Sequence, residues 1–351
     1  GEEFNLNSSQ QLAVILFDKL KLPMIKKRST AEAVLSELKD KHPLPELILS
    51  YRKLYKLKNT YLDPLPSYII SETQRVHSSF NQTMTATGRL STSSPNFQNI
   101  PIRTEDGKEI RKAIKAQSNE YQIFSADYSQ VELRVMAHLS GDESLISALN
   151  NGEDIHTFTA KNIFNIDNDD MVLPEMRRIA KIVNFGIMYG AGPFRLSQEL
   201  DIPFGEAKQI KDAYFKKYQG IEKYIENSKL QIKETKSVET LLGRKRAVWD
   251  SDSQNKIRRD AAERMAINMP IQGTAAEMIK LAMIKIHRQM NKENLKSKLI
   301  MQIHDELLLE VHQDEVDYIS KMVIENMRDA MKLDVPIEID FGVGPSWYEA
   351  H

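Results

Sequence analysis

Residues 121–134 read YQIFSADYSQVELR and change in character halfway along. The first part, from Tyr121 to Ala126, mixes aromatic and β-branched side chains with polar ones, which is typical of a β-strand. From Val131 the apolar residues recur at the spacing of an α-helix, so we expect a helix to follow the strand. Asp127 lies at the junction, where the end of a strand holds a side chain in a fixed position. This stretch therefore predicts a mixed α and β fold with an acidic group at a strand end.

A second acidic group is expected at the tip of a β-hairpin formed by residues 298–311. His304, Asp305 and Glu306 separate two largely apolar runs there, and residues 337–343 form a further expected strand. Two carboxylates on adjacent strands suit a pair of divalent ions about 4 Å apart, which activates an attacking oxygen and stabilises a leaving one. Magnesium prefers carboxylate and phosphate oxygens. Because a lone aspartate is more often a turn or cap residue, the spacing alone leaves that interpretation open.

A basic segment that ends in aromatic residues lies between the two acidic groups, with the sequence RRIAKIVNFGIMYG at residues 177–190. Arg177, Lys181 and Phe185 are four residues apart and share one face of a helix with about 3.6 residues per turn. Two cations followed by a ring suit a nucleoside triphosphate, whose phosphates meet Arg and Lys while its sugar or base meets the ring. The alternative is a surface helix with a solvated basic face and its aromatic residues in a core.

The rest of the chain is expected to be mainly helical outside one polar region. Residues 1–65 are expected to form short helices, residues 66–101 loops and short strands, and residues 141–260 helices without long strands. A helix at 261–268 is expected to stop at Pro270. A new helix is expected after Thr274, which fits a capping box with Glu277. This order indicates two or three subdomains within 351 residues.

Composition restricts the class of protein. The chain has 41% hydrophobic and 28% charged residues, no cysteine and a formal net charge of −1. These values fit a soluble globular protein, and no apolar run reaches the roughly 18 residues that a membrane span needs. The absence of cysteine excludes disulfides and thiolate metal sites and agrees with a cytoplasmic location. Basic residues gather at 51–58, 244–246 and 256–259, either as solvated helix faces or as local contacts to nucleic acid. The start carries neither an initiator Met nor a signal segment, which indicates a piece of a longer protein.

Three segments together resemble the motifs of family A DNA polymerases. Residues 127–134 resemble motif A, residues 177–190 motif B and His304-Asp305-Glu306 motif C, while TGRLS at 87–91 and PNFQNIP at 95–101 resemble the signature before motif A. The likeness covers essentially the whole chain. It implies an α+β fold of the right-hand polymerase type with an antiparallel palm sheet, helical fingers and a partial helical thumb. We accordingly expect the thumb at 1–65, the palm at 66–140 and 261–351, and the fingers at 141–260.

The resemblance also implies an activity and its participants. It indicates a monomeric bacterial, cytoplasmic DNA-directed DNA polymerase that binds primer–template DNA and deoxynucleoside triphosphates, with two Mg²⁺ ions for which Mn²⁺ can substitute. It assigns catalysis to Asp127, Asp305, Glu306 and Lys181, with Tyr128 joining the two aspartates at the metal ions. Glu132 matches the residue that blocks a 2′-hydroxyl, and we expect it to bond to Tyr189. Phe185, where a Tyr would add a hydroxyl, implies discrimination against dideoxynucleotides.

Two longer sets of residues follow from the same resemblance. The nucleotide pocket is assigned to Arg177, Lys181, Phe185, Tyr189, Glu132, His156, Tyr128 and Gln130. Contacts to DNA are assigned to Arg89, Gln272, Arg264, Asn268, Asn96, Gln98, Asn99, Arg52, Lys56 and His304. Individually, such residues are more often plain surface, turn or core residues. The competing functions are a single-subunit RNA polymerase, which shares the aspartates and the basic helix, and a catalytically silent fragment that only binds primer–template DNA.

Overall fold

The structure is a computed structural model that describes residues 3–100 and 105–351. Gly1, Glu2 and Pro101, which belong to segments used for the family resemblance, lie outside the described residues. The chain divides into two compact units, one formed by residues 1–79 and 93–110 and the other by residues 80–92 and 111–351. Each unit is described by itself.

The smaller unit is built from short helices, as expected for residues 1–65. Its buried apolar side chains, which include Leu12, Leu16, Leu35 and Ile48, form a separate small core. Pro43 starts the longest of these helices, at a position where its missing N–H has no intrahelical partner to lose. The elements are α1 (Ser9–Ala13), η1 (Val14–Lys19), α2 (Glu32–Leu38), α3 (Pro43–Leu57), η2 (Lys58–Leu62), η3 (Leu65–Tyr68), β1 (Ile69–Ile70), β2 (Arg75–Val76), η4 (Phe97–Asn99) and α4 (Glu105–Glu109).

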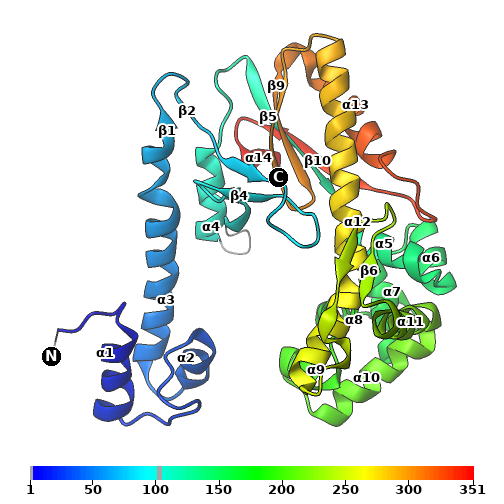
Figure 1. Ribbon diagram of the computed structural model, residues 1–351. Helices are drawn as coiled ribbons and strands as arrows, with labels where there is room; N and C mark the ends of the chain where they lie inside the picture. The colour runs from blue at the N-terminus through cyan, green and yellow to red at the C-terminus, as the bar shows by residue number, and fades with distance from the viewer. Residues whose placement is uncertain (1–2, 101–104) are drawn as a thin grey trace. The chain divides into compact units, whose positions relative to one another are not determined.

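The larger unit contains a four-stranded antiparallel sheet (Figure 1). Its strands are β5 (Tyr121–Tyr128), β8 (Lys298–Ile303), β9 (Glu306–His312) and β10 (Ile339–Gly344), in the order β10-β5-β9-β8. The expected first strand, the expected hairpin and the expected third strand are therefore confirmed. Strand β9 is buried along its whole length, because both faces of the sheet centre are covered.

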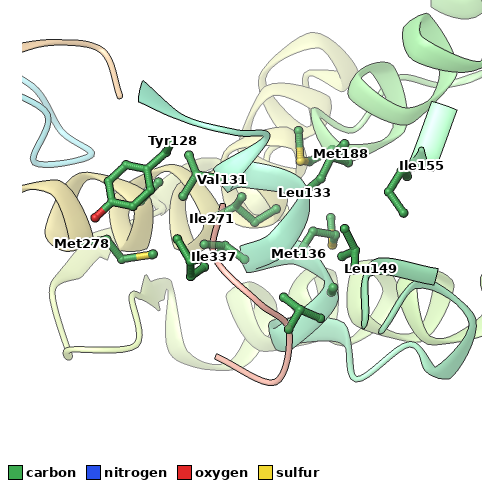
Figure 2. Close-up of a cluster of buried hydrophobic side chains, with 14 of the residues drawn as sticks. Tyr128, Val131, Leu133, Met136, Leu149, Ile155, Met188, Ile271, Met278 and Ile337 are labelled. Atoms are coloured by element: carbon green, nitrogen blue, oxygen red, sulfur yellow. The ribbon is translucent and has the colours of Figure 1, made fainter. Parts of the chain in front are cut away.

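Helix α5 (Val131–Ser140) follows β5 and packs its apolar face into the main core. Gln130 precedes it with a left-handed backbone, φ 52°, which turns the chain sharply from strand to helix. Figure 2 shows Val131, Leu133 and Met136 in one buried cluster with the ring of Tyr128. The sharp turn places the end of β5 and the start of α5 side by side, which positions the residues of the expected motif.

The remaining segments of the larger unit are mostly helical, as expected for residues 141–260. They are β3 (Ser79–Asn81), β4 (Ser91–Ser93), η5 (Ile110–Ala113), α6 (Glu143–Asn150), α7 (Ile155–Phe164), η6 (Asp169–Met171), α8 (Pro174–Met188), α9 (Pro193–Leu200), α10 (Phe204–Lys217), α11 (Gln219–Thr235), β6 (Ser237–Glu239), β7 (Lys245–Ala247), η7 (Trp249–Asp252), η8 (Gln313–Glu315), α13 (Val316–Arg328) and α14 (Trp347–Ala350). Strands β3 and β4 lie where the chain passes between the two units. Within the described residues, no helix combines the length and the apolar character that a membrane span requires.

Helix α12 (Lys256–Lys292) corrects the expectation of a break at Pro270. It continues through Pro270 for 37 residues and is seen as one long helix in Figure 1. Pro270 removes one backbone donor, but it is buried with Met269 and Ile271, and this packing outweighs the lost bond. The expected capping box is also wrong. Both of its residues lie inside the helix and bond to the β6–β7 region instead, Thr274 to Leu241 N and Glu277 to the Thr240 hydroxyl.

Candidate active site

The two aspartates lie at neighbouring positions on the sheet. Asp127 is the seventh residue of β5 and is paired in register with Glu306 on β9 and Asp340 on β10. Directly paired residues of antiparallel strands project to the same face, so these three carboxylates share one side of the sheet. Asp305 is in the turn between β8 and β9, and its carbonyl oxygen accepts a hydrogen bond from Tyr128 N at 3.3 Å. The structure therefore brings the two predicted acidic groups together.

The acidic cluster is electrostatically unfavourable without a cation. Burial, together with the nearby charges of Asp305, Glu306 and Asp340, raises the pKa of Asp127 to about 7. Burial also raises the pKa of Asp305, against the opposing effect of Arg89. The Oδ1 atom of Asp127 is buried and has no hydrogen-bond partner. A buried carboxylate oxygen without a donor is rare in proteins, and a metal ion is one of the partners that resolves it.

Glu306 differs from the two aspartates because protein donors hold its carboxylate. Ser125 Oγ and Trp347 Nε1 donate to Glu306 Oε1 at 2.6 and 2.7 Å. Burial by itself raises the pKa of Glu306, but His351, Ser125 and Trp347 outweigh it and the pKa is lowered. The guanidinium of Arg111 lies 4.1 Å over the Trp347 ring. Glu306 is thus a fixed anion, positioned by helix α14, beside the aspartates.

Glu132 is buried at the start of α5 and both of its carboxylate oxygens have donors. Tyr189 OH donates to Oε2 at 2.7 Å, which confirms the expected bond, and Arg89 Nη2 donates to Oε1 at 2.6 Å. Burial raises the pKa of Glu132, while Tyr189 and Arg89 oppose this shift. The bond from Arg89 was not expected, because this residue was assigned to DNA. The assignment of Arg89 to DNA stays a prediction.

The basic face of α8 is formed as the spacing predicts. Lys181 is exposed, and Arg177 forms a two-point ion pair with Asp154, the N-cap of α7, at 3.0 and 2.7 Å. This pair and the Thr157 amide outweigh burial and lower the pKa of Asp154 to about 2. Phe185 is half-buried, and its ring centroid is 6.3 Å from that of Tyr189 and 5.8 Å from that of His156. The face therefore offers cations at one end and aromatic rings at the other.

A pocket of about 410 Å³ lies beside Tyr189. Helix α12 contributes Arg264, Asn268 and Gln272, which are spaced four residues apart and therefore form one stripe facing the pocket. Oδ1 of Asn268 is buried without a hydrogen-bond partner. All three residues were assigned to DNA from the resemblance. The pocket also contains residues that were not assigned from the sequence, Thr87, Arg195, Arg246, Met265 and Met269.

Several assigned residues lie elsewhere or act through other atoms. The side chain of Tyr128 is in the core beside Met278, and its hydroxyl donates to Met327 O at 2.8 Å, so its ring is not available to a nucleotide (Figure 2). The side chain therefore does not support the assignment of Tyr128 to the nucleotide, and its assignment to the metal ions stays a prediction. His304 is exposed in the turn before Asp305 with φ 55°. Gln130 supplies a backbone carbonyl to the start of α5.

The remaining assigned residues belong to the smaller unit. Arg52 on α3 donates to Thr30 O at 2.5 Å and is half-buried, whereas Lys56 is exposed on the same helix. Asn96 caps η4 by accepting from Gln98 N at 3.1 Å, and Asn99 O accepts from Tyr61 OH. Their assignment to DNA stays a prediction.

Some residues of the site carry no local signal in the sequence. Asp340 was missed, although pairing the expected strand at 337–343 with β5 places it opposite Asp127. Arg111 and Trp347 approach Glu306 from distant segments, which no local pattern predicts. Asp154 was given no role from the sequence, yet it caps α7, because its Oδ1 accepts from Thr157 N at 2.7 Å, and it also pairs with Arg177.

Comparisons with known proteins agree with these features. The family model described as DNA polymerase family A matches residues 1–349. The chain is 47% identical to DNA polymerase I of Bacillus subtilis (strain 168) over 354 residues and 49% identical to the thermostable DNA polymerase I of Thermus filiformis over 356 residues. These matches cover 100% of this chain but 40% and 42% of those proteins. The chain thus spans about two fifths of the length of these relatives.

A solved structure is similar over the whole chain. The POL domain of Pol1 from M. smegmatis, in complex with a DNA primer-template and a dNTP, matches with a TM-score of 0.94 and 42% sequence identity. The match covers 100% of this chain and 62% of that chain. The expected α+β polymerase fold is therefore confirmed. The paired carboxylates of the sheet, the bonded Glu132 and Tyr189, and a family match over almost every residue lead to one assignment: this chain belongs to DNA polymerase family A.

Proposed function

We propose that this chain catalyses template-directed DNA synthesis, in which a primer 3′-hydroxyl attacks the α-phosphorus of a deoxynucleoside triphosphate and pyrophosphate leaves. The observation that carries the proposal is the position of Asp127 and Asp305 on one sheet, within the same compact unit as the bonded Glu132–Tyr189 pair. Acidic groups that repel one another in a buried place are typical of sites that function with a bound cation. The names of the relatives support the same activity.

The acidic cluster fits a divalent metal ion. Asp127 offers a buried carboxylate oxygen without a donor, and Asp305 lies beside it. Among residues 3–100 and 105–351 there is no group of three or more acidic or histidine side chains arranged around a single metal position. Mg²⁺ is often held by one or two carboxylates while phosphate oxygens and water complete its shell. We assign two such ions to Asp127, Asp305 and the backbone of Tyr128, with Mn²⁺ as a substitute. Ions held there would lower the pKa of the primer hydroxyl and neutralise charge on the leaving group.

The nucleotide is proposed to lie along the exposed face of α8. Arg177, Lys181 and His156 bind the triphosphate, and Lys181 meets the charge that develops on the pyrophosphate. Arg177 then exchanges all or part of its pairing with Asp154 for a phosphate. Phe185 packs against the sugar. Glu132 excludes a 2′-hydroxyl, because its carboxylate is buried and held in place by Tyr189 and Arg89, and a new hydroxyl there would disturb these bonds.

DNA is proposed to contact the stripe of Arg264, Asn268 and Gln272. The minor groove presents acceptors at similar places in all correct base pairs, so Arg and Gln side chains test the shape of a pair without reading its sequence. We keep Arg89, His304 and the residues of the smaller unit, Asn96, Gln98, Asn99, Arg52 and Lys56, as further DNA contacts. We assign the thumb to residues 1–65, the palm to 66–140 and 261–351, and the fingers to 141–260, in a monomer of the bacterial cytoplasm.

A primer-extension assay tests the proposal. The chain is mixed with a primed single strand, Mg²⁺ and either deoxy- or ribonucleoside triphosphates, and a gel shift on the same DNA measures binding. We expect longer products with deoxynucleotides only. Extension with ribonucleotides but not with deoxynucleotides indicates the alternative, a single-subunit RNA polymerase. A gel shift without extension under either condition indicates a fragment that only binds DNA, and it overturns the proposed activity.

A further inference from the structure

A chain of buried polar side chains runs from His156 on α7 through Asn184 on α8 and Thr159 to Tyr218 at the end of α10. All four are at most 2% exposed. Asn184 Nδ2 lies 3.1 Å from His156 Nδ1 and 3.1 Å from Thr159 Oγ1, and Thr159 Oγ1 lies 2.8 Å from Tyr218 OH. Buried polar groups that satisfy one another are held in one arrangement, because each alternative leaves a group unpaired.

This arrangement determines which imidazole nitrogen of His156 carries the proton. The amide nitrogen of Asn184 faces His156 Nδ1 at 3.1 Å, while the Thr159 hydroxyl lies within 3.2 Å of both the oxygen and the nitrogen of the amide. An amide nitrogen only donates, so Nδ1 of His156 has to accept. A neutral imidazole has one donor and one acceptor, and the remaining proton is therefore on Nε2.

The other side of the His156 ring is suited to an anion. Nε2 has no hydrogen-bond partner among the described residues, and Arg177 and Lys181 are near enough to act on the ring electrostatically. Burial and the two cations together lower the pKa of His156 to about 4, against the opposing effect of Asp154. The ring is thus neutral near pH 7 and presents a single N–H beside two positive charges.

We infer that Asn184, itself fixed by Thr159 and Tyr218, holds His156 in the neutral Nε2–H tautomer, so that Nε2 donates a hydrogen bond to a phosphate oxygen of the incoming nucleotide. The inference rests on the proposed function for the identity of the anion. Asn184 touches no nucleotide in this arrangement and is a positioning residue. As a neutral donor, His156 orients the phosphate without bringing a positive charge of its own. Arg177 and Lys181 then supply the positive charge that balances the pyrophosphate.

The tautomer is directly measurable by nuclear magnetic resonance. Long-range ¹H–¹⁵N spectra of the whole chain, labelled at its histidines, distinguish a protonated from an unprotonated ring nitrogen, and the signals of His156 are those that disappear in His156→Gln. We expect Nδ1 to be unprotonated and Nε2 protonated between pH 6 and 8. Asn184→Asp replaces the amide donor by an acceptor and is expected to place a proton on Nδ1. Asn162 lies on the same helix α7 as His156, and its side-chain amide donates to Phe158 O and not to His156. Asn162→Asp adds the same charge and is expected to leave the His156 signals unchanged.

An Nδ1–H tautomer in the native chain overturns the inference, as does an unchanged tautomer in Asn184→Asp. If Asn184→Asp does not fold, the native spectrum alone still decides the assignment.

Kinetics test the link to the nucleotide. Because a hydrogen bond to a charged phosphate is lost, Asn184→Asp is expected to raise KM for the deoxynucleotide roughly tenfold or more, while the Kd for primer–template DNA stays unchanged. Asn162→Asp is expected to keep the native KM. An unchanged KM in a folded Asn184→Asp that has the altered tautomer overturns the role at the phosphate. Failure of the native chain to extend any primer contradicts the proposed function instead, and the spectrum remains a test of the tautomer.

Discussion

The Glu132 carboxylate combines burial with full hydrogen bonding at the level of a single residue. It is 8% exposed, and its two oxygens accept from Tyr189 and Arg89. Breaking either bond leaves a buried polar group without a partner, which costs about 1–3 kcal/mol. Under the proposed function, this cost would disfavour a nucleotide that brings an additional hydroxyl to the same place.

Removing this carboxylate should weaken the choice between sugars. In Glu132→Ala we expect the ratio of kcat/KM for ribo- over deoxynucleotides to rise roughly tenfold or more, because the bulk of the side chain and its engaged carboxylate are both removed. Single-nucleotide incorporation with each substrate measures the ratio. Tyr189→Phe deletes only one hydroxyl from the pair and should give a smaller rise. A ratio in Glu132→Ala equal to that of the native chain would remove Glu132 from sugar selection.

The buried ring of His156 should make folding stability depend on pH. Its pKa is about 4 in the folded chain, below the ordinary value of 6.5, so the unfolded chain binds more protons between these values. The contribution is fully present above pH 6.5 and is lost as the pH falls from 6.5 toward 4, by roughly 2 kcal/mol between pH 7 and 5. Urea unfolding at the two pH values measures it. His156→Gln should reduce this pH dependence, whereas His77→Gln, at an exposed position, should not. Equal slopes in all three proteins would contradict the assignment.

Helix α12 shows how one element serves both the core and the site. Its buried face contributes to the main core, while Arg264, Asn268 and Gln272 face the pocket. Gly273 allows close contact with the β6–β7 region, because a Cβ there would lie 2.4 Å from Thr240 Cγ2 and 3.3 Å from Thr87 O. The position of the stripe in the pocket therefore depends on a residue without a side chain.

Adding a methyl group at this contact should destabilise the protein. Gly273→Ala is expected to lower the free energy of unfolding by about 1–3 kcal/mol, because the neighbouring backbone and Thr240 have to move. Gly205→Ala, in helix α10 with no atom within 4 Å of the added carbon, is expected to raise it by up to about 1 kcal/mol. Thermal or urea denaturation compares the two variants. Equal stabilisation by both would show that α12 does not pack as closely as described.

At the scale of the whole molecule, local patterns predicted the elements better than their long-range contacts. The strand at 121–127 and the hairpin with Asp305 in its turn were predicted, because alternation and turn residues are local signals. The bond between Glu132 and Tyr189 was predicted from the family resemblance. Pro270 misled the prediction, because a rule for isolated helices takes no account of burial in a core.

Contacts between distant segments were outside the reach of local patterns. Arg89 is 43 residues from Glu132, and Trp347 is 41 residues from Glu306. Asp340 becomes part of the acidic face only when β10 pairs with β5. The chain of Asn184, Thr159 and Tyr218 behind His156 likewise depends on the packing of three helices. Each of these contacts follows from the tertiary fold, which the pattern of a single segment does not specify.

Primer extension by two carboxylate variants tests the central claim most directly. In Asp127→Asn and in Asp305→Asn, extension with Mg²⁺ should fall roughly a thousandfold or more, because several kcal/mol of charge stabilisation are lost, while Kd for primer–template DNA stays near its native value. Asp340→Asn, on the same face of the sheet but without an assigned metal contact, should retain extension within about tenfold. Extension near the native rate by either Asp127→Asn or Asp305→Asn would contradict the assignment of the metal ions to this pair.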